Sequence, residues 1–211
     1  MTEHVSGLPD VEVGDAAGLL DAVPAFCRRQ ADRCAERGID TSGWPVSHVA
    51  VRARTWRDYL TWREALEPLC TGNLENVWNG RPISKLALAR PVAVALADPG
   101  GSGRTEQSVP LLELIPPFHQ RVYRMGLEHV GYVVGDDLDA FGRRFHDVLT
   151  GRQFQSAVNS PYYVLFGDYT HVKFHRWSLM DVCLREGRSF DGFEHADWTP
   201  SDLDAGPYEV W

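Results

Sequence analysis

Two histidines occupy equivalent places in two short apolar segments of this 211-residue chain. His48 lies in SHVAVRA and His129 lies in EHVGYVV, and each is followed by a valine and a small residue. Glu113 lies between leucines in PLLELIPP, where a carboxylate is costly to bury unless a positive charge compensates it. Two neutral imidazoles and one carboxylate form a ligand set that suits Fe(II), Mn(II), Ni(II) or Zn(II) and leaves coordination positions open. The three residues therefore predict a mononuclear divalent-metal site.

Each of these residues also has a simpler interpretation. A single strand histidine is usually a hydrogen-bonded core residue, and a single strand glutamate usually faces solvent. The metal interpretation is favoured because the histidines sit at matching points of a repeated pattern. When SHVAVRA is aligned on EHVGYVV, His48 matches His129, and alignment of the last strands places Glu113 over Lys173.

A repeated order of strands and a helix must position these residues. At Ser47 the apolar period changes from 3.6 to 2, which indicates a strand, and the same order of elements begins again at Leu127. The predicted elements are a strand at 47–53, a helix at 55–70, strands at 83–90, 91–97 and 108–115, a strand at 127–134, a helix at 136–149, strands at 152–158, 162–167 and 170–175, and a helix at 178–187. The sequence therefore predicts an α+β fold in which β-α-β-β-β occurs twice.

A helical stretch at 15–37 precedes this repeat. Pro24 is expected to split it into two helices, because an interior proline removes a backbone hydrogen bond and clashes with the preceding turn. Gly38 is expected to end the second helix. The predicted organisation is an N-terminal helical extension at 1–45, a first βαβββ module at 46–118, a second at 126–178, and a C-terminal helix and tail at 179–211, all within one structural domain.

Five stretches of the chain carry a resemblance to a known family. They are SHVAVR, LENVWNGRPI, LLELIPP, LEHVGYVV and VKFHRWS, and they span roughly residues 45–180 in order. In them the chain resembles the YecM family, within the vicinal oxygen chelate superfamily of glyoxalases, bleomycin-resistance proteins and extradiol dioxygenases. The resemblance implies that the two modules form a cupped mixed sheet with a metal at its centre. It also implies that His48, Glu113 and His129 are the ligands.

The last strand of the second module departs from the superfamily pattern. The fourth ligand there is commonly a carboxylate, whereas the aligned residue is Lys173, whose ammonium cannot ligate a metal. Either the site has three protein ligands, or His175, two residues on and on the same face, provides the fourth. Lys173 and His175 are candidate catalytic residues for proton transfer, and Lys173 also suits a substrate charge. The alternative for Lys173 is a side chain whose ammonium reaches the surface.

Four further residues are predicted to contact a substrate. Arg52 shares the face of the first histidine, and its planar guanidinium suits a carboxylate or phosphate, although it equally suits a structural acid. Asn79 and Arg81 belong to a turn between strands, where an Asn-Gly pair is typical of a hairpin, and Arg81 is a candidate to close over the site. Tyr163 is one of two adjacent tyrosines that point to opposite faces, and it is assigned to the cup.

The remaining histidines and the cysteines are assigned no chemistry. His4, His119 and His171 have no matching partner in the repeat, so they are interpreted as structural or exposed. The four cysteines form no CxxC pair, and Cys27 and Cys34 lie seven apart on the expected helix as buried thiols. Without an export signal, all four are expected to be reduced.

Composition limits the possible partners. The formal net charge of -8 argues against binding to nucleic acid or anionic membranes, because phosphate recognition needs clustered cations. The N-terminal sequence lacks the apolar stretch of a signal peptide, and no stretch approaches the length that spans a bilayer. We therefore expect a cytoplasmic protein, a monomer or homodimer, whose partner is a small molecule.

Two classes of function fit these observations. The first is a metal-dependent enzyme of isomerase, lyase or dioxygenase type, in which the metal chelates two neighbouring oxygens of a small substrate. The second is a non-catalytic protein of the same fold that binds a small molecule, as in drug resistance, or that binds a metal without turnover. Resistance-type relatives generally lack the metal triad, so the triad favours the enzyme.

Overall fold

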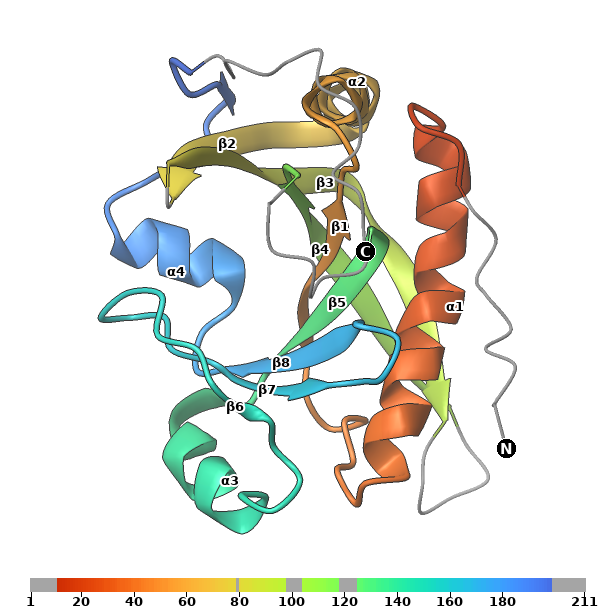
Figure 1. Cartoon of the computed structure of the whole chain (residues 1–211), viewed down its shortest axis with the longest axis vertical. Helices are drawn as coiled ribbons and strands as arrows, with labels where there is room; N and C mark the ends of the chain where they lie inside the picture. The colour runs from red at the N-terminus through yellow and green to blue at the C-terminus, as the bar shows by residue number, and fades with distance from the viewer. Residues whose placement is uncertain (1–10, 79, 98–103, 118–124, 199–211) are drawn as a thin grey trace.

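The computed structural model describes residues 11–78, 80–97, 104–117 and 125–198, and it shows an α+β protein with one long N-terminal helix and a nine-stranded mixed sheet (Figure 1). The α+β class and the N-terminal helix are as predicted. In chain order the elements are α1 (Ala16–Ala35), β1 (Val46–Arg52), α2 (Trp56–Leu66), η1 (Glu67–Leu69), β2 (Cys70–Trp78), β3 (Arg81–Ala97), β4 (Arg104–Ile115), β5 (Gly126–Val133), η2 (Gly135–Asp137), α3 (Leu138–Arg144), β6 (Gly151–Arg152), β7 (Tyr162–Leu165), β8 (His171–His175), α4 (Leu179–Arg185) and β9 (Phe193–Glu194).

The strand pairing is similar on the two sides of the central β1–β5 pair, except that β9 is added in parallel to β2 at one edge. The strand order is β6-β7-β8-β5-β1-β4-β3-β2-β9. The central strands β1 and β5 are antiparallel, while β1 pairs in parallel with β4 and β5 pairs in parallel with β8. Ala50 lies opposite Glu113 in the first parallel pair, and Gly131 lies opposite Lys173 in the second. Residues that the sequence aligns between the two halves therefore occupy corresponding places in the sheet.

Alternating residues give the sheet two different faces. On one face, residues such as Val49, Tyr132 and Phe174 form the main hydrophobic core with side chains of α1, α2 and α3. Each buried side chain of this size contributes about 1.5–3 kcal/mol, so this core fixes the strands. The other face carries His48 and its neighbours, and α4 contacts β1. Figure 1 shows α1 and α4 on opposite sides of the sheet.

Helix α1 is continuous through Pro24, so the predicted break into two helices is wrong. Proline removes only one backbone hydrogen bond, whereas the residues on both sides of it, including Leu19, Val23 and Phe26, are buried in the same core. Packing therefore overrides the local preference. The predicted end at Gly38 is confirmed: its φ is 77°, and the Ile39 N–H donates to the Cys34 carbonyl at 2.9 Å, as in a glycine cap.

The strand assignments of the first half need correction. The segments predicted as strands 83–90 and 91–97 form the single strand β3, with an irregular register between Ala87 and Val92 that accommodates Pro91. Strand β2 was not predicted, because CTGNLENVW is mostly polar and short of the residues typical of strands. In the second half, the segment predicted as strand 152–158 contributes only Arg152 to β6.

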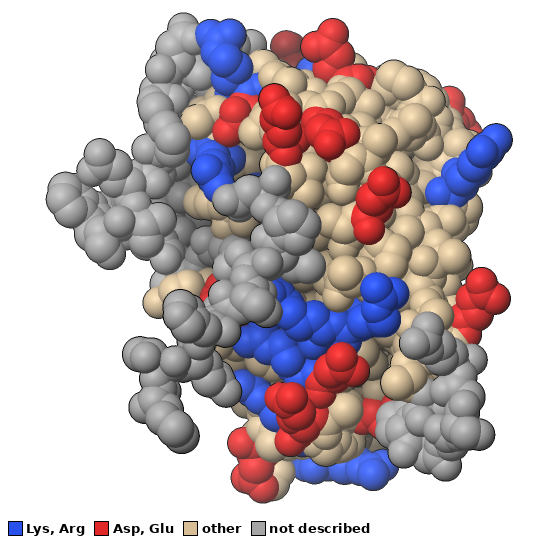
Figure 2. Space-filling model, turned by 90° about the vertical axis from the view of Figure 1, so that its right-hand side faces the viewer, with Lys and Arg blue, Asp and Glu red and all other residues tan. Residues whose placement is uncertain are grey.

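On the side of the molecule that carries α1, Figure 2 shows a patch of basic side chains with acidic ones beside it, while much of the surrounding described surface carries no charge. The basic residues of α1 are all arginines, and Arg29 and Arg33 pair with Asp168. In the described part of the chain, no helix is long and apolar enough to cross a membrane. All four cysteines are unpaired, and Cys27 and Cys34 are buried as expected.

Candidate metal centre

Three side chains meet across the three central strands of the sheet. His48 comes from β1, Glu113 from β4 and His129 from β5. The two histidine Nε2 atoms are 3.2 Å apart, and the Glu113 Oε2 atom lies 3.3 Å from the His129 Nε2 and 3.8 Å from the His48 Nε2. Both histidines are buried, while 13% of the Glu113 side chain is exposed. The structure thus gathers the predicted ligand set at a point with limited access to solvent.

The outer nitrogen of each ring has a partner that fixes the ring. The His48 Nδ1 lies 2.9 Å from the Ser47 hydroxyl, which also accepts a hydrogen bond from the Leu179 N–H of α4 at 2.8 Å. The His129 Nδ1 lies 3.0 Å from the Glu128 carboxylate. A carboxylate acceptor holds the proton of the ring on Nδ1 and leaves a lone pair on Nε2. The Ser47 hydroxyl oxygen has two lone pairs, so besides the Leu179 N–H it can accept a hydrogen bond from a protonated Nδ1 of His48. The lone pair of His48 then also lies on Nε2.

This arrangement leaves three acceptor atoms facing one another. With Nδ1 protonated on both rings, the two Nε2 lone pairs and the Glu113 carboxylate converge on one point. Such atoms repel unless a proton or a cation lies between them. Burial lowers the pKa of His48 to about 3, although the nearby Glu113 opposes this shift. The donor set therefore fits a cation.

The spacing of the three atoms also fits one metal ion. Ligand atoms held at about 2.1 Å from a metal are about 3.0 Å apart at 90° and about 3.4 Å apart at 109°. Two of the observed distances, 3.2 and 3.3 Å, fall within this range. The third, 3.8 Å between the His48 Nε2 and the Glu113 Oε2, corresponds to a wider angle of about 130° at the same bond length. The two imidazoles and the carboxylate occupy one side of such an ion, so its other positions remain open for oxygen ligands.

A second group of potential ligands shares one member with the first. It consists of Glu128, His129 and His171, all buried. The Arg52 guanidinium already pairs with the Glu128 carboxylate. Burial raises the pKa of Glu128, whereas the charge of Arg52 and the hydrogen bond with His129 lower it. The lowering is larger, so the net pKa of this carboxyl lies far below its usual range. Since Glu128 already has its cation and is 1% exposed, the group around Glu113 is the better candidate.

The two residues proposed for catalysis lie beside this group but outside it. The His175 ring is centred 5.3 Å from that of His48, its Nδ1 lies 3.2 Å from the Asn159 amide oxygen, and its Nε2 is buried without a hydrogen-bond partner. Lys173 is 8% exposed. Burial lowers the pKa of both side chains, and for Lys173 the nearby Glu113 opposes this shift. Among the described residues, the site therefore offers three ligands rather than four.

Gly131 is required by the close approach of His48. A Cβ atom at Gly131 would lie 2.4 Å from the His48 Cε1 and 2.7 Å from its Nδ1. Any side chain there would push the ring away from the other ligands. Gly131 lies between His48 and Lys173 in the register of the sheet. Its lack of a side chain leaves room for the imidazole ring of His48 over β5.

The predicted substrate contacts are placed as follows. Arg52 pairs with Glu128 and donates to the Pro116 carbonyl at 3.2 Å, which matches its alternative role as partner of a structural acid. Tyr163 lies opposite Lys173 on β7 and so shares its face. Arg81 begins β3, beside the turn, while Asn79 lies outside the described residues.

Several residues of the site were not identified from the sequence. Their signals are weak, because Ser47 and Glu128 each adjoin a histidine in a strand where the alternation rule assigns neighbours to opposite faces. A register irregularity between Val46 and His48 relaxes that rule in β1. His171, interpreted as structural or exposed, is buried and stacks on His129 with ring centroids 4.5 Å apart. His4 and His119 lie outside the described residues.

We expect the Ser47→Ala variant to bind metal about 10–100-fold more weakly than the wild-type protein, because loss of an outer hydrogen-bond partner frees the ligand ring. The His48 Nδ1 would lose its partner, and α4 would lose the acceptor of the Leu179 N–H. Competition with a chromophoric zinc chelator measures the change. Ser108→Ala, at an exposed position of β4, is the matched control. Equal affinities in both variants would contradict this role of Ser47.

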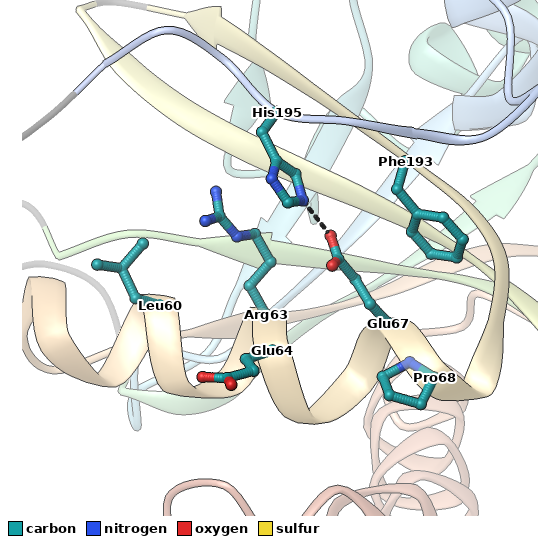
Figure 3. Close-up of a pocket in the computed structure, with 7 residues that line it drawn as sticks. All are labelled: Leu60, Arg63, Glu64, Glu67, Pro68, Phe193 and His195. Atoms are coloured by element: carbon teal, nitrogen blue, oxygen red, sulfur yellow. Dashed lines mark hydrogen bonds and ion pairs between the residues drawn. The ribbon is translucent and has the colours of Figure 1, made fainter.

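A surface pocket of about 490 Å³ lies elsewhere, between α2 and the segment that follows α4 (Figure 3). It is lined by Leu60, Arg63, Glu64, Glu67, Pro68, Phe193 and His195. Its polar centre is a pair in which the His195 Nε2 lies 2.5 Å from the Glu67 carboxylate. None of the triad residues lines this pocket. Among the described residues, the pocket also contains no group of three side chains placed to hold a metal ion.

Comparison with known proteins gives a consistent result. Residues 15–160 match the family model described as YecM protein. Protein YecM of Escherichia coli strain K12 is 21% identical over 189 residues, which cover 82% of this chain and 95% of that protein. A solved structure described as structural genomics protein EC4020 superposes with a TM-score of 0.62 at 23% identity, covering 82% of this chain and 93% of the other. At this identity the structural likeness shows the fold alone.

Proposed function

Because the chain belongs to the YecM family, and because its sheet brings two histidines and a glutamate together, we propose that it is a metal-dependent enzyme acting on a small oxygenated substrate. The observation that carries the proposal is the convergence of His48, Glu113 and His129 with their acceptor atoms 3.2 to 3.8 Å apart. The ligand set suits Fe(II), Mn(II), Ni(II) or Zn(II).

The symmetry of the strand order supports the two-module part of this proposal. The pairings β1–β4 and β5–β8 are both parallel, and each is continued by antiparallel partners towards the edge of the sheet. Two βαβββ modules joined through β1 and β5 would place the triad at the centre of a cupped sheet. The proposed centre is thus built from both modules, as the vicinal oxygen chelate resemblance implies.

The roles of the individual residues follow from their places. When bound, the divalent ion would supply Lewis acidity to two neighbouring oxygens of a substrate, which suits isomerase, lyase or dioxygenase chemistry. Ser47 and Glu128 orient the ligand rings, and Arg52 holds Glu128. Lys173 and His175 are the groups placed to move a proton near the substrate.

Elemental analysis of protein purified without added metal tests the proposal. We expect close to one equivalent of Fe, Mn, Ni or Zn per chain, removable by a chelator and restored on addition of the same ion. Oxygen uptake during a substrate screen then separates dioxygenase chemistry from isomerase or lyase chemistry. A protein that contains no metal and takes up none would overturn the proposal and would favour the non-catalytic binding alternative.

A further inference from the structure

The chain uses lysine in an unusual way. Of its 21 basic residues only two are lysines, Lys85 and Lys173, and the other 19 are arginines. Both lysines are buried, at 7% and 8% exposure, although lysine is among the residues most rarely buried. The positive charges on the surface of the protein therefore come from arginine rather than lysine. A buried ammonium costs free energy unless something negative compensates it, so these two positions call for an explanation.

The two lysines belong to two rows of paired residues, and each row contains ligands of the proposed metal centre. Lys85 lies directly opposite Glu113 on β3, and Lys173 lies opposite Gly131 on β8. Between them, β1 carries Ala50 at the position opposite Glu113. One row thus runs from Lys85 through Glu113 and Ala50 to His129, and the other runs from Lys173 through Gly131 to His48. The amines approach the ligands from β3 on one side and from β8 on the other.

Among the residues that the structure describes, the hydrogen-bond partners of these amines are fewer than their donors. An ammonium offers three donors. Lys85 donates one hydrogen bond to the Asn76 amide oxygen. Within the described ranges, Lys173 makes no hydrogen bond or ion pair. The charge of Glu113 acts on both lysines, but Glu113 is also the candidate metal ligand, so its charge would be shared with the ion.

The formal charges at this place have an excess of positive sign. A divalent ion and two ammonium groups would together carry four positive charges, against two negative charges, from Glu113 and from Glu186 near Lys85. Arg52 and Glu128 cancel each other, because they form an ion pair. Donor groups and positive charge both require a ligand that is anionic and rich in acceptor oxygens. A neutral substrate would add no negative charge to balance the two ammonium groups.

We propose that Lys85 and Lys173 bind the negative charge of the substrate from opposite sides of the metal centre, and that the substrate is therefore a small organic anion with neighbouring oxygens, such as a 2-oxo or 2-hydroxy carboxylate. The inference rests on the proposed function, because the neighbouring oxygens are those that a metal would chelate. Lysine suits this task because its compact charge and three rotatable donors adapt to an oxygen that approaches between strands.

The presence of only two lysines makes the test direct. Full-length protein labelled with carbon-13 at the lysine Cε and loaded with Zn(II), a diamagnetic ion, should give two lysine signals by NMR. The Lys85→Met and Lys173→Met variants assign them. Oxalate serves as the probe, because it is a small dianion with neighbouring oxygens, and hydroxyacetone is the neutral counterpart. We expect both signals to shift along one saturation curve with oxalate, and neither to shift with hydroxyacetone.

Calorimetric titration with oxalate supplies the affinities. Each methionine variant should bind oxalate at least about tenfold more weakly, which is the loss expected for a hydrogen bond to a charged group. The matched control, Arg90→Met, removes the same charge from an exposed position of β3 and should bind oxalate as the wild type does. Zinc content is measured in every sample.

The outcomes separate this inference from the function on which it rests. Failure of the wild-type protein to bind zinc or any of the other three ions would overturn both. Bound zinc with stationary lysine signals, or with unchanged oxalate affinity in both methionine variants, would overturn the anionic substrate and leave the metal centre standing. Tight binding of hydroxyacetone with no preference for oxalate would do the same.

Discussion

The His129→Ala variant is expected to bind metal more weakly by over about a hundredfold, beyond the loss caused by removing an outer partner. His129 is the ligand that lies closest to both of the others, at 3.2 Å from the His48 Nε2 and 3.3 Å from the Glu113 Oε2. Without it, two ligands remain whose atoms are 3.8 Å apart. Zinc affinity by chelator competition measures the effect, and any activity should be lost in parallel.

The matched control for this variant is His146→Ala. The His146 side chain is 71% exposed, so its loss should leave metal binding unchanged. A urea titration of each variant shows whether the fold is retained. A folded His129→Ala protein with wild-type affinity for zinc would refute the triad.

We expect the Arg52→Met variant to be destabilised by about 3–5 kcal/mol, because removal of one partner leaves a buried charge uncompensated. Arg52 and Glu128 are 6% and 1% exposed, and the Arg52 guanidinium donates to the Glu128 carboxylate. Methionine keeps most of the volume of the side chain, so the change removes the charge and the hydrogen bond to the Pro116 carbonyl without leaving a large cavity. The loss is a large part of the total stability of about 5–15 kcal/mol that is usual for a domain. Urea unfolding at pH 7 measures it.

The double variant Arg52→Met/Glu128→Gln tests the cause. Glutamine keeps an acceptor for the His129 Nδ1–H but carries no charge. If the loss arises from the unpaired carboxylate, the double variant should recover most of the stability. A double variant as unstable as Arg52→Met alone would show that the other contacts of the arginine, such as its hydrogen bond to the Pro116 carbonyl, matter more than the ion pair.

The sequence was informative about the site where residue types recur at matching positions. His48 and His129 stand out because each occupies the same point of a repeated strand, and Glu113 stands out as a carboxylate among leucines. Lys85 gave no such signal, because its importance depends on the register that places it opposite Glu113. Arg52 was ambiguous for the same reason, since only the structure shows that the neighbouring strand supplies Glu128.

The fold was predictable where local patterns agree with packing. The helix cap at Gly38 depends on a positive φ that glycine adopts without strain, so it could be predicted from the local sequence. The two errors at prolines have one cause. Pro24 and Pro91 both disfavour regular structure locally, but each is overridden by long-range packing or by a register irregularity that removes the cost. Strand β2 forms because it pairs with β3 and β9, and its own polar sequence does not indicate these pairings.

The central pairing of β1 with β5 has a consequence for biosynthesis. His48 and His129 are 81 positions apart in the chain, yet their Nε2 atoms are 3.2 Å apart. While the ribosome is still making the first half, the nascent chain contains His48 and Glu113 but lacks the third ligand. The binding site comes into existence only when β5 has emerged and paired with β1, so a metal ion cannot guide the earlier steps of folding. Metal loading should therefore be a late event that follows completion of the sheet.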